Sequence, residues 1–357
     1  MIKRENFTED YIRALQKQSR RDPVLLERTI YAFGLLEAIS LAGLPFIFKG
    51  GTCLMLLLNE PRRLSTDIDI IVEPGTDIDA FIDKAAQIFP FVHQEEQVRI
   101  GRNNIVKRHF KFTYDSPINK KPFYILLDIL FEHHQYAKIV EKEICNDLLA
   151  IETPPITVRI PSVECILGDK LTAFAPHTTG IPLNIGKDME VMKQLYDVST
   201  LLDVFEDFDL VRETYWKIAK DELAYRGSDN SIEGCLADTF RASLCIASRG
   251  KFLKDEYRLY VTGIRELRGH IYSENYTPEV AVGRAAKAAY MALCLLTDHT
   301  YEKIADYKES LTEQLTHEDL SSVRFLRKAA PEAYAYMVKV DRILAPALQL
   351  CPDLFEQ

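Results

Sequence analysis

Two short stretches of the chain carry residue types that could bind a phosphorylated ligand. Gly50-Gly51-Thr52 precedes an apolar segment, and Asp67-Ile68-Asp69 follows it. Two glycines at the start of a helix let a phosphate reach backbone N–H groups that a Cβ would obstruct, and a threonine adds a hydroxyl. Paired carboxylates on one strand supply the oxygen ligands that Mg²⁺ prefers. Together the two stretches predict a phosphate seat beside a divalent cation, which is nucleotide chemistry.

The tetrapeptide Thr-Asp-Ile-Asp occurs twice, and the residues that follow each copy distinguish the two. After Thr66–Asp69 comes the β-branched run Ile70–Val72, typical of a buried strand on which Asp67 and Asp69 share one face. After Thr76–Asp79 come good helix formers, so a helix is expected over 77–88, capped by Thr76 with Asp79. The second pair of acids then favours a helix N-terminus and binds nothing.

Asp128 is the next candidate, because it is the single acid in the apolar run Phe123–Phe131. This run is typical of a central strand, where an isolated carboxylate faces a large desolvation penalty unless a cation or hydrogen-bond donors satisfy it. A third metal ligand beside Asp67 and Asp69 would explain it, with Mg²⁺ or Mn²⁺ as the ion and a nucleoside triphosphate as substrate. The alternative is an acid on the open face of an edge strand.

Two later segments carry further candidates. Lys170 lies in a segment expected to be helical and could reach a triphosphate, or could be a solvated lysine beside Asp169. Lys193 and Asp197 are four residues apart on one helix, where a surface ion pair is the default interpretation.

Basic residues near these motifs have two interpretations each. Arg62 and Arg63 could screen phosphates near the seat or could lie on the surface. The stretch 99–111 holds five basic side chains and no acid. It could grip an RNA backbone, or its charges could protect a solvated strand edge.

Composition excludes several classes of protein. The 357 residues are 47% hydrophobic and 27% charged, enough for a globular core and for two domains. No apolar leader opens the chain and charges interrupt its apolar stretches, so we expect no membrane association. The seven cysteines lack metal-type spacing and are expected to be reduced, buried thiols in the cytoplasm. A net charge of −9 argues against nucleic-acid binding over the whole surface but allows a local basic groove.

The expected fold class is α+β: a mixed β-sheet core flanked by helices over 1–160, then an all-helical region over 161–357 that contributes Lys170 and Asp197 to the cleft. A helix is expected from Val24 to Ala42, since Asp22-Pro23 can cap it and Gly43 can end it. The other expected elements are strands at 46–48, 91–100, 105–114, 123–131 and 157–160, and helical patterns at 53–58, 162–174, 187–202, 236–248, 253–268, 280–297, 301–318 and 320–348.

Four motifs, in this order, resemble those of the AbiEii/AbiGii toxin family. They are Phe48–Leu54, Arg63–Ile70, Gly168–Leu171 and Lys193–Val198. Members of that family are nucleotidyltransferases with a DNA-polymerase-β-like core, found as toxin halves of bacterial toxin–antitoxin and phage-abortive-infection systems. The resemblance covers about residues 25–205, and the remainder is similar only in being helical.

The resemblance assigns a role to each matching position. It implies that Asp67 and Asp69 bind the metal, that Lys170 contacts a nucleotide phosphate, and that Asp197 belongs to the late motif. Many relatives have an acid after the late lysine, where this chain has Gln194, so a catalytic and a structural role for that helix both stay open. The phosphate-binding and nucleotide-binding positions are Gly50, Gly51, Thr52, Arg63 and Ser65.

The resemblance also implies a reaction. We expect Asp67 and Asp69 to hold Mg²⁺ on a nucleoside triphosphate while Asp128 binds a second ion or takes the proton of an acceptor hydroxyl. The acceptor implied is the 3′ end of tRNA, gripped by the basic hairpin 99–111 and the helical region, with a cognate antitoxin as partner. Two alternatives stay open: nucleotidylation of a small molecule or a protein, and an inactive protein that only binds a nucleoside triphosphate.

Overall fold

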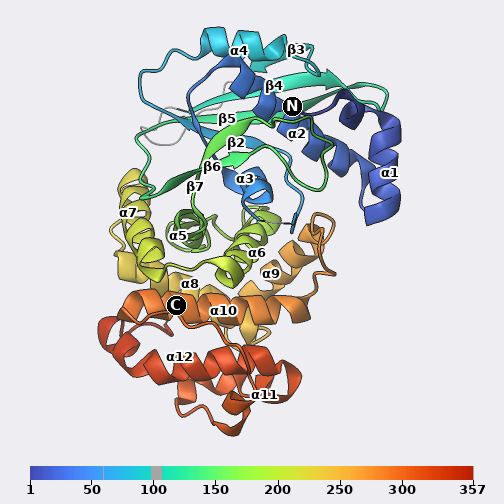
Figure 1. Ribbon diagram of the computed structural model, residues 1–357. Coiled ribbons are helices and arrows are strands. Elements are labelled where there is room, and N and C mark those ends of the chain that lie inside the picture. The colour runs from blue at the N-terminus through green and yellow to red at the C-terminus, as the bar shows by residue number, and fades with distance from the viewer. Residues whose placement is uncertain (59, 98–106, 357) are drawn as a thin grey trace. The chain divides into compact units, whose positions relative to one another are not determined.

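The computed structural model describes residues 1–58, 60–97 and 107–356, and the chain divides into two compact units (Figure 1). The first unit consists of Met1–Ser162 together with Gly269–Glu274, a short segment that returns to it from far along the chain. The second consists of Val163–Arg268 and Asn275–Gln357. The expected α+β class is confirmed, since strands are described in the first unit and the second is helical.

A five-stranded mixed sheet forms the centre of the first unit. Its order is β1-β2-β5-β4-β3, with β2 and β5 parallel and the other neighbours antiparallel. β5 is therefore a central strand, as its apolar run predicts, and the edge-strand alternative for Asp128 is wrong. The strands are β1 (Ile47–Lys49), β2 (Ile68–Val72), β3 (His93–Glu96), β4 (Lys107–Asp115) and β5 (Pro122–Phe131).

The two faces of this sheet differ in burial. On one face, alternate residues of β4 and β5 are fully buried, among them Phe112 and Leu127. α2 (Pro23–Ala42) packs against β2 and β5, and α4 (Asp79–Ala86) packs on α2 and β3. The opposite face is only partly buried at Asp69, His109 and Asp128. Because side chains alternate along a strand, this open face collects the polar residues that interrupt the apolar runs.

Local sequence signals set the ends of α2. Asp22 accepts a hydrogen bond from Leu25 N at 2.9 Å, Pro23 occupies the first turn, and Gly43 ends the helix at φ +91°. These are the signals from which the helix was expected. The remaining elements of the unit are η1 (Arg4–Phe7), α1 (Glu9–Ser19), α3 (Gly50–Leu57), β6 (Ile139–Glu143) and β7 (Thr157–Pro161).

The second unit is built from long apolar helices. α10 lies at its centre, packing against α6, α8 and α12. It is long and apolar enough to cross a membrane by length and composition, yet 72% of that stretch is buried inside the protein. The helices are α5 (Val163–Ala173), α6 (Asp188–Val204), α7 (Phe208–Arg226), α8 (Ile232–Ala247), α9 (Lys254–Leu267), α10 (Pro278–Thr297), α11 (Leu326–Ala329) and α12 (Pro331–Leu350), with η2 (Glu309–Thr312) and η3 (Glu318–Val323).

Several sequence expectations need correction. Thr76 does not cap α4, because its hydroxyl donates to Glu73 O and Asp77 accepts from Asp79 N instead. The segment 301–318 is irregular apart from short 3-10 turns, since its charged residues offer no continuous apolar face. β6 and α7 were not anticipated. Residues 101–104, which join the expected strands 91–100 and 105–114, lie outside the described residues.

A buried carboxylate joins α2 to the sheet. Glu27 has no exposed surface and accepts hydrogen bonds from Tyr114 Oη at 2.9 Å, Ser116 Oγ at 2.9 Å and Ile118 N at 3.1 Å. Burial, together with the negative charge of Glu27, raises the pKa of Tyr114, so the phenol stays protonated as a donor. Three donors thus converge on one acid and offset the cost of burying it.

Replacing this carboxylate should destabilise the first unit. We expect Glu27→Ala to lower the free energy of unfolding by about 3 kcal/mol, because it leaves three donors without their acceptor. The control Tyr114→Phe removes one donor and should cost about 1 kcal/mol. Urea denaturation followed by circular dichroism measures both, and an equal loss in the two variants would contradict the proposed network.

Candidate active site

The backbone at the start of α3 lies against a carboxylate of β2. α3 begins at Gly50, directly after β1, and Gly50 has φ +84°. A Cβ built on Gly50 would lie 2.1 Å from Asp69 Oδ2, so any side chain there would collide with the carboxylate. The glycine is therefore required both by its conformation and by its close approach to Asp69.

The second glycine lies beside a cation and a hydroxyl. A Cβ on Gly51 would be 2.5 Å from Arg63 Nη2 and 2.9 Å from Ser65 Oγ. Arg63 is only 6% exposed, so the interpretation of it as a surface arginine is wrong. A helix start, a guanidinium and a hydroxyl together form a seat suited to an anion such as a phosphate.

The returning segment 269–274 holds the residues around this seat in place. Leu64 N donates to His270 O at 2.7 Å, and Tyr272 N donates to Arg62 O at 2.8 Å. A β-bridge also joins Arg63 to Ile271. Backbone hydrogen bonds thus fix the chain on either side of Arg63, through a contact between residues about 200 positions apart that no sequence motif announces.

The two strand acids lie in one row across the open face of the sheet. Asp69 and Asp128 are direct partners in the parallel pairing of β2 with β5. Partners in a ladder point to the same face, so the two carboxylates are neighbours. Asp67 precedes β2 by one residue, and its side chain is 48% exposed. Sequence reasoning put these acids on strands, but only the pairing register brings Asp128 beside Asp69.

His109 extends the same row and was not among the predicted site residues. It is the partner of Asp128 in the β4–β5 ladder, and its Nδ1 lies 2.7 Å from Asp128 Oδ1. An ionised carboxylate only accepts hydrogen bonds, so Nδ1 carries the proton that it donates to Asp128. Strand alternation opposite Phe110 and Phe112 could have placed His109 on the open face, but not next to Asp128.

Thr52 and Arg28 fix Asp67. The Thr52 hydroxyl, fully buried, donates to Asp67 O at 2.6 Å and so ties α3 to the start of β2. Arg28 Nη2 lies 3.6 Å from Asp67 Oδ1. The phosphate contact expected of Thr52 stays a prediction, while its hydrogen bond gives it a definite positioning role.

The donor set at this place suits magnesium. Asp67, Asp69 and Asp128 present carboxylate oxygens, which are hard ligands of the type Mg²⁺ and Mn²⁺ take. In the part of the chain that the structure describes, no group of three or more His, Cys, Asp and Glu side chains is arranged to hold a metal. The chemistry of the donors fits, and the three-carboxylate site itself stays a prediction.

Lys170 and Asp197 form a buried pair in the second unit. Lys170 Nζ lies 3.1 Å from Asp197 Oδ2, with the side chains 12% and 1% exposed. Gln194 Oε1 accepts a further hydrogen bond from Lys170 at 3.2 Å. The default of a surface pair between Lys193 and Asp197 is wrong, because Lys193 pairs with Glu190. The alternative of a solvated Lys170 is also wrong, because its side chain is only 12% exposed.

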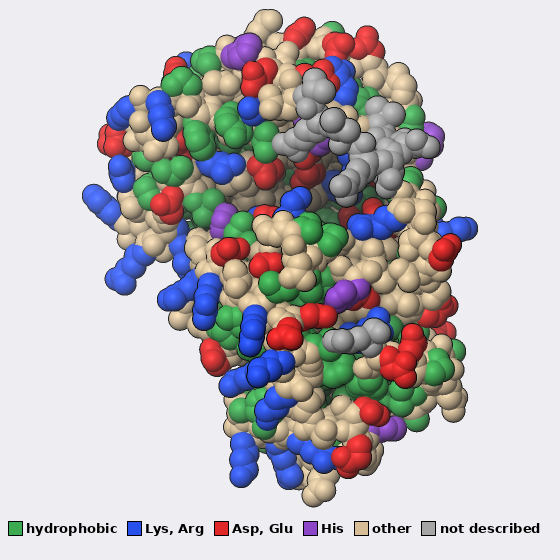
Figure 2. All heavy atoms as spheres, turned by 180° about the vertical axis from the view of Figure 1, so that it is seen from behind, with side chains coloured by type: hydrophobic (Ala, Val, Ile, Leu, Met, Phe, Trp, Pro, Cys, Tyr) green, Lys and Arg blue, Asp and Glu red, His purple; other side chains and the backbone are tan. Residues whose placement is uncertain are grey.

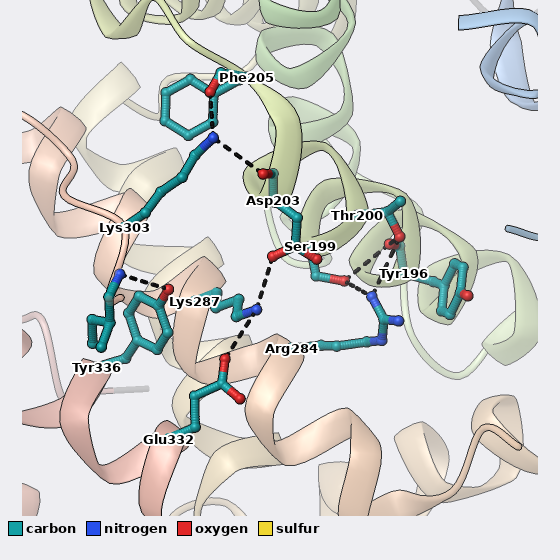
Figure 3. Close-up of polar contacts among 11 residues, drawn as sticks. Tyr196, Ser199, Thr200, Asp203, Phe205, Arg284, Lys287, Lys303, Glu332 and Tyr336 are labelled. Carbon is teal, nitrogen blue, oxygen red and sulfur yellow. Dashed lines mark hydrogen bonds and ion pairs between the residues drawn. The ribbon is translucent and has the colours of Figure 1, made fainter. Parts of the chain in front are cut away.

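Polar contacts from α10 hold α6, the helix that carries Asp197 (Figure 3). Arg284 Nη1 donates to Ser199 Oγ at 2.8 Å, and its guanidinium lies 4.2 Å from the centre of the Tyr196 ring. Lys287 Nζ lies 2.8 Å from Asp203 Oδ1. Asp197 thus lies on a helix whose C-terminal half is anchored to α10.

The described part of the basic hairpin is largely paired with acids. Arg108 contacts Glu96 and Asp79 at 2.7 Å each, and Lys111 lies 3.3 Å from Glu95. The hydrogen bonds from Arg108 lower the pKa of Glu96. The positions Arg99 and Arg102 lie outside the described residues, so RNA binding by 99–111 stays a prediction.

Two solved structures from Helicobacter pylori are similar to this chain: that of JHP933, and that of a candidate nucleotidyltransferase. Each has 15% sequence identity and a TM-score of 0.45, and covers 76% of this chain. The alignments cover 94% and 96% of those two chains. No curated protein matches the sequence.

The family comparison gives the assignment. The sequence model described as nucleotidyl transferase AbiEii toxin, type IV toxin–antitoxin system, matches residues 34–270, more than half of the chain. The match spans the glycine pair, the strand acids, Lys170 and Asp197, and confirms the resemblance drawn from the motifs. The chain therefore belongs to the AbiEii family of nucleotidyltransferase toxins.

Proposed function

We propose that this enzyme transfers a nucleoside monophosphate from a nucleoside triphosphate to an acceptor hydroxyl in a magnesium-dependent reaction. One observation carries the proposal: the glycine-lined seat with Arg63 and Ser65 lies directly beside Asp69, whose ladder partner is Asp128. A phosphate seat next to paired carboxylates is what a metal-bound triphosphate requires.

Each residue of this site has a task in the proposal. The N–H groups at Gly50 and Gly51, with Arg63 and Ser65, bind and orient the triphosphate. Asp67, Asp69 and Asp128 would hold Mg²⁺, which would supply Lewis-acid polarisation of the phosphoryl oxygens. The acceptor hydroxyl gives its proton to a base, for which Asp128 is the candidate, its oxygen bonds to the α-phosphorus, and the bond from that phosphorus to the leaving pyrophosphate breaks.

For the acceptor we propose the 3′ end of tRNA, in the cytoplasm, since this is what the family resemblance implies. A type IV toxin–antitoxin family implies a cognate antitoxin as a partner. The resemblance also assigns Lys170 a nucleotide contact, which we include in the proposed function. The buried carboxylate of Asp197 fixes the Lys170 ammonium group.

The acid at 69 should be essential. We expect Asp69→Asn to lower label transfer from α-³²P nucleoside triphosphates to total tRNA by roughly a thousandfold, because it removes several kcal/mol of metal-dependent stabilisation. Asp77→Asn is the control, since it removes an exposed acid from the second copy of the tetrapeptide, and should leave transfer intact. Transfer that persists in Asp69→Asn would exclude the proposed site. If the label appears on a protein or on a small molecule, that molecule and not tRNA is the acceptor, and the proposed nucleotidyl transfer still holds.

His109 should act as a positioning residue for Asp128. We expect His109→Leu to weaken Mn²⁺ binding, measured by electron paramagnetic resonance without nucleotide, and to lower kcat by roughly 10- to 100-fold, because the carboxylate loses its orienting donor. His109→Asn keeps a hydrogen-bond donor near the position of Nδ1, so it should recover part of the Mn²⁺ affinity and part of kcat. The control is His133→Leu, which breaks a hydrogen bond to Glu73 of equal length, 2.7 Å, at an exposed position. Mn²⁺ affinity unchanged in His109→Leu would contradict this role.

Removing Lys170 separates its structural role from its functional one. We expect Lys170→Met to cost about 3 kcal/mol or more of unfolding free energy, because the buried Asp197 loses its partner, and Asp197→Asn in the same chain should restore part of the loss. The control Lys193→Met removes a more exposed pair and should cost less than about 1 kcal/mol. A raised KM for the nucleoside triphosphate in the stable double variant indicates a nucleotide contact, and an unchanged KM limits Lys170 to stability.

A further inference from the structure

A stripe of basic side chains runs along the outer side of α9. Lys254, Arg258 and Arg265 lie on this helix, Arg268 follows its last residue, and all four are exposed. At 100° per residue, the four positions fall within about 80° of one another, on the side away from the buried residues of the helix. The helix has 14 residues, so the stripe is about 21 Å long.

These basic side chains have few carboxylate partners. In the part of the chain that the structure describes, no carboxylate pairs with Lys254, Arg265 or Arg268, and Arg258 has only a 3.8 Å contact with the highly exposed Asp255. By contrast, Arg108, Lys111 and many other basic side chains of the protein have carboxylate partners. The stripe therefore keeps its positive field.

One of the three acids of α9, Glu256, is turned inward. Glu256 Oε1 lies 3.3 Å from His177 Nε2, while Asp238 Oδ1 lies 2.9 Å from His177 Nδ1. The hydrogen bond to Asp238, then that to Glu256, raises the pKa of His177 to about 10, so the imidazole is a cation at neutral pH. This cation engages Glu256, so the exposed acids of α9 are Asp255 and Glu266, against the four exposed basic side chains of the stripe.

An aromatic ring with more basic neighbours extends this surface. Lys251 Nζ lies 4.0 Å from the centre of the Phe325 ring, and Arg249 lies 5.7 Å from it. The exposed basic residues of the same segment are Arg324, Arg327 and Lys328. In Figure 2, Lys and Arg side chains gather in a column along one flank of the helical unit, in a chain whose net charge is −9.

We propose that this surface, hereafter the α9 surface (Lys251, Lys254, Arg258, Arg265, Arg268 and the basic residues around Phe325), binds the phosphate backbone of the RNA acceptor. This inference rests on the proposed function. A nucleic-acid strand carries a phosphate about every 3.4 Å along a duplex, so a 21 Å stripe spans roughly six. A helix that inserts into a membrane needs a strongly apolar exposed side, which α9 lacks, and aromatic rings among basic residues suit stacked bases.

The test uses the full-length Asp69→Asn chain without nucleotide, so that binding is measured apart from turnover. Fluorescence anisotropy with labelled total tRNA, repeated over a series of NaCl concentrations, gives the affinity and its salt slope. Arg258→Gln with Arg265→Gln should weaken binding roughly tenfold and reduce the slope by about 2, because two phosphate contacts are lost. The matched control, Lys220→Gln with Lys308→Gln, removes two exposed charges of the same unit. It should change neither the tRNA affinity nor the salt slope.

The outcomes separate this inference from the proposed function. RNA binding by the α9 surface would be overturned if the Arg258/Arg265 variant kept its tRNA affinity and its salt slope. It would also be overturned if that variant lost binding to anionic phospholipid vesicles but not to tRNA. Loss of tRNA binding in that variant supports RNA binding by the α9 surface, whether or not the enzyme with Asp69 intact transfers label to tRNA. Failure of that enzyme to label tRNA would count only against tRNA as the acceptor. In an active enzyme, a raised KM for tRNA with unchanged kcat and unchanged KM for the nucleoside triphosphate supports it further.

Discussion

The candidate site depends on the close approach of the Gly50 backbone to the carboxylate of Asp69. A Cβ at Gly50 would lie 2.1 Å from Asp69 Oδ2, and φ at this residue is +84°. A side chain at this position would clash with the carboxylate, and a left-handed backbone conformation favours glycine. Because α3 starts at this contact, its first N–H groups, Arg63 and Ser65 all lie near one edge of the acid row. The glycine thus lets the start of α3 lie directly against the Asp69 carboxylate.

Like charges on neighbouring strands impose a second constraint. Asp69 and Asp128 share a face and a register position, so their negative charges repel each other unless cations or donors offset the repulsion. Arg28 beside Asp67 and His109 beside Asp128 provide part of this compensation within the first unit. A divalent ion bound there, as proposed, would add to this compensation.

The helical unit uses charge differently in its interior and at its surface. Inside, Lys170 and Asp197 offset each other's burial, and Arg284 and Lys287 anchor α6 to α10. Outside, Lys254, Arg265 and Arg268 of the α9 surface have no carboxylate partner among the described residues and Arg258 has only a 3.8 Å contact with Asp255, while His177 engages Glu256. Buried charges need partners to survive desolvation, whereas exposed charges can be left for a ligand.

Local signals in the sequence determined the ends of α2, the central strand of Asp128, the glycine-led start of α3 and the family itself, because each depends on neighbouring residues or on short motifs. Tertiary structure alone decided the rest. The pairing of β2 with β5 and of β4 with β5 made Asp69, Asp128 and His109 neighbours, and the return of residues 269–274 fixed the chain around Arg63. The partner of Asp197 is Lys170 on another helix and not Lys193 one turn away. Register, returning segments and partners of buried charges depend on contacts between residues far apart in the chain, and the spacing of letters in the sequence does not encode those contacts.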